Sequence, residues 1–155
     1  MSIASFPKNE NKRGQAIVET AVVLLVIVLF TFGITEFGRV MYIKNMLNNA
    51  ARAGARQAAL TTWDGTPKSY PNIAYGSCST TDQIEKTICS GLLYLQSPIE
   101  VSASVTSLDP SGNQRALSGD TVTVTVTLTK FTPVVSIMSS FISPTITGTA
   151  SMRHE

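Results

Sequence analysis

The sequence is poor in charge and in residues that usually carry chemistry. Of its 155 residues, 14% are Asp, Glu, Lys or Arg, and its single histidine is His154. No Cys or His lies near enough in sequence to another to suggest a metal site. The motifs G-x-S-x-G and H-E-x-x-H, the P-loop and the dinucleotide fingerprint are all missing. We therefore expect no enzymatic activity, no metal and no cofactor.

The sequence also lacks the clustered basic face on a folded domain that nucleic-acid binding requires, so we expect no nucleic-acid partner. The formal net charge is +2, with +2 in residues 1–14, +3 in 36–60 and −2 in 61–155. Glu19 supplies the remaining negative charge. Removing residues 1–14 would leave a formally neutral chain, and a neutral chain with an apolar helix is inclined to associate.

Proline is absent from residues 15–60, and no residue of 20–35 is charged. A helix needs about 20 apolar residues to cross a ~30 Å hydrocarbon core. Residues 15–37 are therefore predicted to span a lipid bilayer once, and 38–60 to continue the helix amphipathically. Basic residues before the span favour a cytoplasmic N-terminus and an extracytoplasmic C-terminal domain: Lys8, Lys12 and Arg13. Residues 1–13 are polar and are predicted to be unstructured.

Three interpretations of this N-terminal region compete: a cleaved signal peptide, a plain signal anchor, and a pilin-type leader cut after Gly14. The run is long for a signal peptide, and no A-x-A-like site follows it. A carboxylate inside an apolar helix is costly and indicates function. Cutting after Gly14 would make Gln15 the new N-terminus and Glu19 its fifth residue. The new amino group, of the same or a neighbouring subunit, could then pair with Glu19 and offset the desolvation of both.

Three motifs resemble the TadE-like proteins, which are pilin-like components of the Flp/Tad (tight adherence) type IVb pilus system. They are R-G-Q-A-I-V-E at 13–19, I-T-E-F-G-R at 34–39 and N-N-A-A-R-A-G-A-R at 48–56. F-T-P at 131–133 and I-T-G-T-A-S-M-R at 146–153 are similar to that family too. The resemblance implies that a prepilin peptidase cuts residues 1–14 away between Gly14 and Gln15. The chain departs from the pattern at Thr20, where a Tyr or Phe is typical, and lacks a proline inside the run.

Residues 38–60 place small and apolar side chains at helical spacing. This face is predicted to pack on the protein's own sheet. Its membrane-proximal part is alternatively an interface with other subunits. Arg52 and Arg56 form an i,i+4 like-charge pair, which could meet an acidic partner or lipid headgroups, or could be simply solvated. The candidate interface residues are Arg39, Ala51, Arg52, Gly54 and Arg56.

Residues 61–155 are predicted to form a small extracytoplasmic α+β domain. Residues 61–80 are predicted to be a loop, and a helix capped at Thr81-Asp82 is expected over about 82–96. Cys78 and Cys89 are a candidate disulfide if this region lies outside the cytoplasm. Alternation predicts three antiparallel strands, the first two joined by a hairpin loop, and Pro133 could start a short helix to Phe141. The expected strands lie near 99–105, 122–128 and 145–152.

The expected fold is therefore a long N-terminal helix packed on a small antiparallel sheet, as in pilins. The resemblance implies a minor pilin or pseudopilin, inserted in the inner (cytoplasmic) membrane and acting structurally in pilus assembly. Its partners would be the prepilin peptidase, other pilin-like subunits, the assembly platform of the inner membrane and the bilayer. The alternative is a permanently anchored extracytoplasmic binding module that never enters a fibre.

Overall fold

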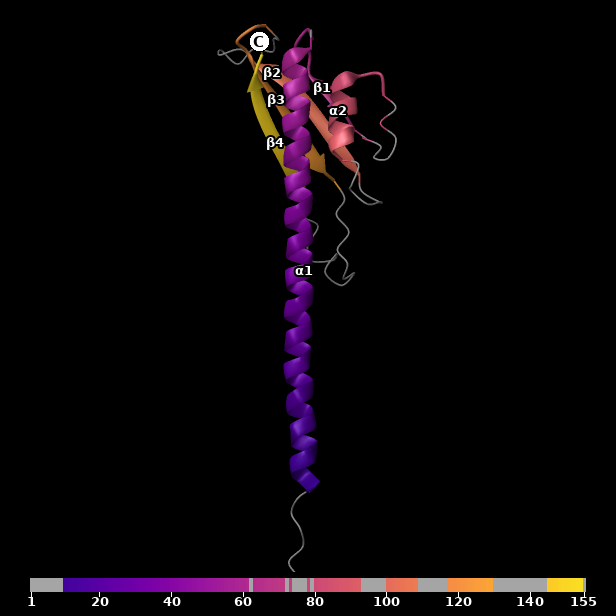
Figure 1. Cartoon of the computed structure of the whole chain (residues 1–155), viewed down its shortest axis with the longest axis vertical. Helices are drawn as coiled ribbons and strands as arrows, with labels where there is room; N and C mark the ends of the chain where they lie inside the picture. The colour runs from indigo at the N-terminus through magenta and orange to yellow at the C-terminus, as the bar shows by residue number, and fades with distance from the viewer. Residues whose placement is uncertain are drawn as a thin grey trace, which may run out of the picture. The chain divides into compact units, whose positions relative to one another are not determined.

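The structure is a computed structural model, and it describes residues 10–61, 63–71, 73, 78, 80–92, 100–108, 117–129 and 145–154 (Figure 1). The chain divides into two compact units, residues 1–38 and 39–155. The first unit contributes the beginning of helix α1, and the second contains the rest of α1 and all the other elements. Each unit is described by itself.

Helix α1 comprises Glu10–Leu60. Its start contradicts the prediction that residues 1–13 are unstructured, because the backbone is already helical at Glu10. Its end agrees with the prediction. The hydroxyl of Thr61 donates to the carbonyl oxygens of Gln57 (3.0 Å) and Ala58 (3.3 Å), and the Thr61 amide also donates to Gln57 (3.1 Å), which satisfies carbonyl groups at the end of the helix.

The sheet has four antiparallel strands in the sequential order β1-β2-β3-β4. The predicted three are present as β2 (Val101–Leu108), β3 (Thr121–Leu128) and β4 (Ile146–Arg153). The fourth, β1 (Lys68–Tyr70), lies inside the segment predicted to be a loop. It has only three residues, too few for alternation to be recognised, and it is a strand because it pairs with β2.

Strand register places most apolar side chains on one face of the sheet and most hydroxyls on the other; buried Ser107 of β2 is an exception on the inner face. Val105, Val124 and Ala150 lie side by side on the inner face. Two residues farther along β3, Val126 lies between Ala103 and Gly148. The outward residues of β3 are the threonines at 121, 123, 125 and 127. The predicted half-buried strands are therefore confirmed, with the solvated face explaining the threonines.

Helix α2 (Gln83–Gly91) is shorter than the predicted 82–96. It begins as predicted, because Asp82 is the N-cap and its Oδ1 accepts a 2.9 Å hydrogen bond from the amide of Ile84. The predicted disulfide is confirmed: Cys78 and Cys89 are bonded, with Cα atoms 5.7 Å apart. The bond ties the segment before α2 to the second turn of that helix.

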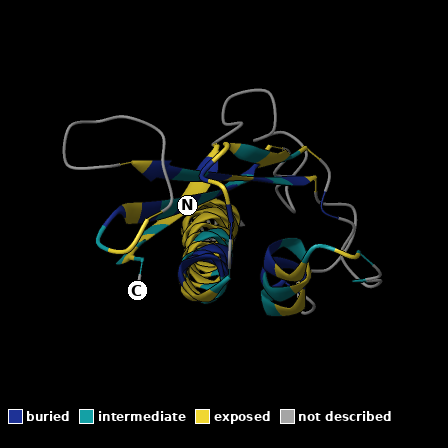
Figure 2. Cartoon of the chain, turned by 90° about the horizontal axis from the view of Figure 1, so that it is seen from above, coloured by how far each residue is buried: buried dark blue, intermediate teal, exposed yellow. Residues whose placement is uncertain are grey.

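Within the second unit, α1 and α2 cover the same face of the sheet (Figure 2). The layers meet in a core that includes Leu47 and Ala51 of α1, Ile88 of α2 and Val124 of β3. Glycines allow these elements to approach closely. A Cβ on Gly148 of β4 would lie 2.5 Å from the carbonyl carbon of Leu47, a position that backbone already occupies.

Some predicted features lie outside the described residues. They are the short helix of 133–141, the strand position Ile99, the end of the second predicted helix beyond Leu92, and residues 109–116 of the hairpin loop.

Replacing Gly148 with alanine should destabilise the outer domain by roughly 2 kcal/mol or more, because the new methyl group meets backbone that cannot rotate away. Urea unfolding of the full chain in detergent measures the change. Thr149→Ala is the matched control, since Thr149 is exposed on the same strand and should cost less than about 1 kcal/mol. Equal effects at the two positions would contradict the close-contact argument.

Candidate functional site

The first unit exposes a nearly uninterrupted apolar surface. The large side chains of its helix are between 42% and 72% exposed from Ile17 to Phe37. A soluble helix buries one apolar face, whereas this one presents apolar groups all round, which is typical of a membrane span. The helix is long and apolar enough to cross a bilayer. It is therefore compatible with a single-pass membrane anchor.

The predicted processing site lies on this helix. Gly14 and Gln15 are both helical and exposed, and nothing lies within 4 Å of a Cβ built on Gly14. A larger side chain at position 14 would therefore meet no other described part of the protein, so packing does not require glycine there. A cut there would have to open the helix locally, and glycine lowers helix stability by about 1 kcal/mol relative to alanine.

Glu19 is exposed among apolar residues, with Val18 63% exposed beside it. It lies four residues after Gln15, about 6 Å along a helix axis. That spacing places the carboxylate one turn from the amino group that cutting would create. The adjacent Thr20 hydroxyl donates to the carbonyl oxygen of Ala16 (2.8 Å), so the threonine is satisfied within the helix.

The small-residue face of α1 packs within the protein. Ala51 is fully buried, and a Cβ on Gly54 would lie 2.6 Å from Cγ1 of Ile88 and 3.4 Å from Cγ1 of Val124. The prediction that this face docks the protein's own sheet is confirmed. Of the five candidate interface residues, Ala51 and Gly54 are therefore occupied internally. Those that keep exposed surface are half-buried Arg39 and the two exposed arginines, Arg52 and Arg56.

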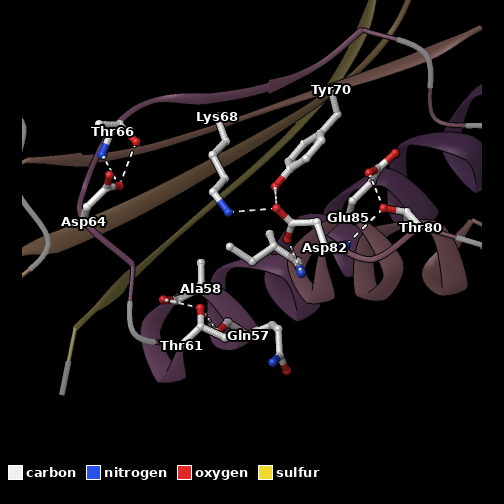
Figure 3. Close-up of polar contacts among 11 residues, drawn as sticks. Gln57, Ala58, Thr61, Asp64, Thr66, Lys68, Tyr70, Thr80, Asp82 and Glu85 are labelled. Carbon is white, nitrogen blue, oxygen red and sulfur yellow. Dashed lines mark hydrogen bonds and ion pairs between the residues drawn. The ribbon is translucent and has the colours of Figure 1, made fainter.

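A polar cluster joins β1 to the start of α2 (Figure 3). Asp82 Oδ2 accepts from Lys68 Nζ at 2.7 Å and from the Tyr70 hydroxyl at 3.0 Å. Sequence analysis identified Asp82 as a helix cap but missed both partners. The only signal was the polar composition of Lys68-Ser69-Tyr70, because their pairing depends on β1 joining the sheet.

The cluster shifts the ionisation of two of its members. Partial burial opposes ionisation of Asp82, but its hydrogen bonds from Lys68, Ile84 and Tyr70 outweigh burial and lower the pKa of the carboxyl. Burial, followed by the hydrogen bond to Asp82, raises the pKa of the Tyr70 hydroxyl. At neutral pH Asp82 is therefore an ionised carboxylate and Tyr70 is neutral.

A cavity of about 260 Å³ lies beside the cluster, between the end of α1 and the start of α2. Its wall combines the apolar side chains of Trp63 and Ile84 with the Lys68–Asp82 pair, and Thr61 and Gln83 complete it. Trp63 is 8% exposed, and its Nε1 has no hydrogen-bond partner among the residues that the structure describes. Within the described residues, no group of three potential metal ligands is present.

The family model described as TadE-like protein matches residues 14–56. The match confirms the resemblance seen in the sequence and covers most of α1, from the predicted processing site to Arg56. It associates the protein with the Tad pilus machinery. Neither the curated proteins nor the solved structures contain a match to the chain.

Asp82→Asn tests the charge of the cluster, because asparagine still caps a helix. Since the folded pKa of Asp82 lies below the unfolded value of about 3.9, its contribution is present above that pH and is lost as pH falls through the folded pKa. We expect the variant to be about 1 kcal/mol less stable at pH 7, with the difference shrinking below pH 4. Urea unfolding at pH 7 and pH 2.5 measures this. A difference that is independent of pH would contradict the assignment.

Proposed function

We propose that the chain is a minor pilin or pseudopilin of a Tad-type pilus, cut between Gly14 and Gln15 and acting structurally in pilus assembly. The carrying observation is that α1 exposes its apolar surface where a membrane or other helices can cover it. The family match to residues 14–56 supports the pilus context. The outer domain would be extracytoplasmic, with the N-terminus in the cytoplasm.

The two halves of α1 support different roles. The apolar half has no partner of its own among the described residues, so it would leave the bilayer only by exchanging lipid for other apolar helices. The second half is already packed on the sheet and α2. Assembly would therefore bundle the first half while each outer domain keeps its own fold. Glu19 would assist by pairing with a new amino group, which offsets the desolvation of both charges.

The disulfide supports an extracytoplasmic outer domain. Cys78 and Cys89 are bonded in the folded unit, and disulfides persist in oxidising compartments such as the bacterial periplasm. The positive residues before the span favour the same orientation. A permanently anchored binding module would share both features, so processing and release from the membrane distinguish the two functions.

Mass spectrometry of the purified protein tests the processing step. In cells with an active prepilin peptidase, we expect a chain beginning at Gln15, and in cells without the peptidase the full chain. Gly14→Ala adds one methyl group at an open position of the helix, so the fold is kept while a peptidase subsite that admits only glycine is blocked. If the wild-type protein were full length both in cells with the peptidase and in cells without it, the result would contradict processing.

Glu19→Ala tests the role of the carboxylate. We expect the variant to be cut normally but to be recovered in sheared fibres at about a tenth of the wild-type level or less, because the new amino group would enter an apolar bundle without a counter-charge. Glu19→Asp is the conservative control and should recover part of the incorporation. Normal incorporation of Glu19→Ala would show that the carboxylate has no part in assembly.

A further inference from the structure

The part of α1 in the second unit carries an uncovered basic face, which we define as Lys44, Arg52 and Arg56. All three are exposed. Arg52 and Arg56 lie on the side of the helix that includes the exposed asparagines 45 and 49, away from the buried positions Leu47 and Gly54, whereas Lys44 lies at the edge of this side, seven residues before buried Ala51. No Asp or Glu occurs between residues 37 and 60. The helix therefore supplies no counter-charge of its own to this face.

Arg52 and Arg56 are the centre of the basic face. As an i,i+4 pair they lie about 6 Å apart along the axis and repel each other. Neither makes an ion pair within the part of the chain that the structure describes. Two parallel guanidinium groups at this spacing match two carboxylates on a facing surface, which they can bind through paired hydrogen bonds.

Distance argues against lipid headgroups as the partner of the arginines. The closely spaced run of large exposed apolar side chains on α1 reaches Tyr42, and exposed Leu60 stands apart from it at the end of the helix. Arg52 follows ten residues after Tyr42, about 15 Å along the axis, and Arg56 about 21 Å. The headgroup layer is only about 5–8 Å thick on each side of the bilayer, and exposed charges are screened over about 8 Å at physiological ionic strength. Lys44 alone lies within reach of the headgroups.

The same domain carries a complementary acidic patch, which we define as Asp64, Asp82 and Glu85. Figure 3 shows Asp64 and Asp82 on opposite sides of Lys68, which is paired with Asp82, and Glu85 beyond Asp82, where it accepts a hydrogen bond from Thr80. Asp64 is fully exposed and Glu85 partly so. The patch is level with the end of α1, because Thr61 and Asp82 line the same cavity. The acidic patch therefore lies farther along the axis of α1, toward its C-terminal end, than the basic face does.

We propose that the basic face of one copy docks on the acidic patch of a second copy, with Arg52 and Arg56 facing Asp64 and Glu85. Because the two surfaces differ, the contact is heterologous, and it can repeat from copy to copy along an open fibre. The Arg pair is centred about six residues before Leu60, so successive copies are offset by roughly 10 Å along the helix axis. The contact names a subunit interface for the proposed fibre and rests on that function.

Charge reversal with rescue tests the contact. The full chain is purified in neutral detergent as wild type, as Arg52→Glu/Arg56→Glu and as Asp64→Lys/Glu85→Lys, and association is measured by analytical ultracentrifugation at low and high salt. We expect salt-sensitive association of the wild type, at least about tenfold weaker association of each variant, and restored association, with the two variants in equal amounts, when they are mixed. Thr147→Glu adds an exposed charge on β4, outside both surfaces, and should associate like the wild type.

The outcomes separate the alternatives. Restored pairing in the mixture also shows that both variants are folded. Asp64→Asn/Glu85→Gln, which keeps the shape and the hydrogen-bond acceptors, should weaken association in the same direction as the reversal. Wild-type association that survives both reversals would overturn the proposal, as would a wild type that stays monomeric at low salt. Wild-type association that survives both reversals is also the result expected if the arginines bind lipid headgroups.

The contact and the proposed function fail in different experiments. Pairing of the purified variants with no protein in sheared fibres would retain the contact and refute the fibre role. Fibre incorporation that both reversals leave unchanged, in a strain lacking the wild-type copy, would retain the fibre role and refute the contact.

Discussion

The close approach of α1 to the sheet and to α2 is the constraint on which the outer domain depends. Three glycines mark it: Gly54 against Ile88, Gly91 against Ala50, and Gly148 against the backbone of Leu47. Beyond the buried Ile43 and Leu47, alanines fill most of the α1 face, so this part of the helix contributes little side-chain volume and the layers approach closely. Larger residues there would separate the layers and open the core. The disulfide and the Asp82 cap then hold α2, the smaller helix, in the same layer.

This packing determines which surfaces of α1 remain available to partners. A stripe of small residues following a membrane span could serve contacts between subunits or contacts within the domain. Ala51 and Gly54 serve the domain, which leaves the apolar span and the charged side of α1 for partners. The span suits lipid or other apolar helices, because such contacts depend on the shape of the apolar surface more than on particular residues. The basic face suits a more specific partner, because two guanidinium groups at fixed spacing select for the position of opposite charges.

Much of this fold followed from periodicity. The helix of 15–60, the alternation of valine and threonine and the cap at Asp82 are local patterns, and each corresponds to an observed element. What could not be predicted depends on contacts between distant residues. Strand β1 is too short to carry a pattern, and the Lys68–Tyr70–Asp82 cluster exists only because β1 pairs with β2 beside α2. Helical structure from Glu10 was missed because polar residues there suggested a disordered leader.

The central claim is that α1 resides in the membrane before assembly and is then incorporated into the fibre. The most direct test is to shear cells, separate fibres from membranes, and quantify the protein in each fraction together with the mass of the chain recovered. The account predicts that a chain beginning at Gln15 leaves with the fibres and disappears from that fraction when the peptidase is removed. A full-length chain that stays entirely in the membrane fraction, while other pilus subunits are released, would contradict it.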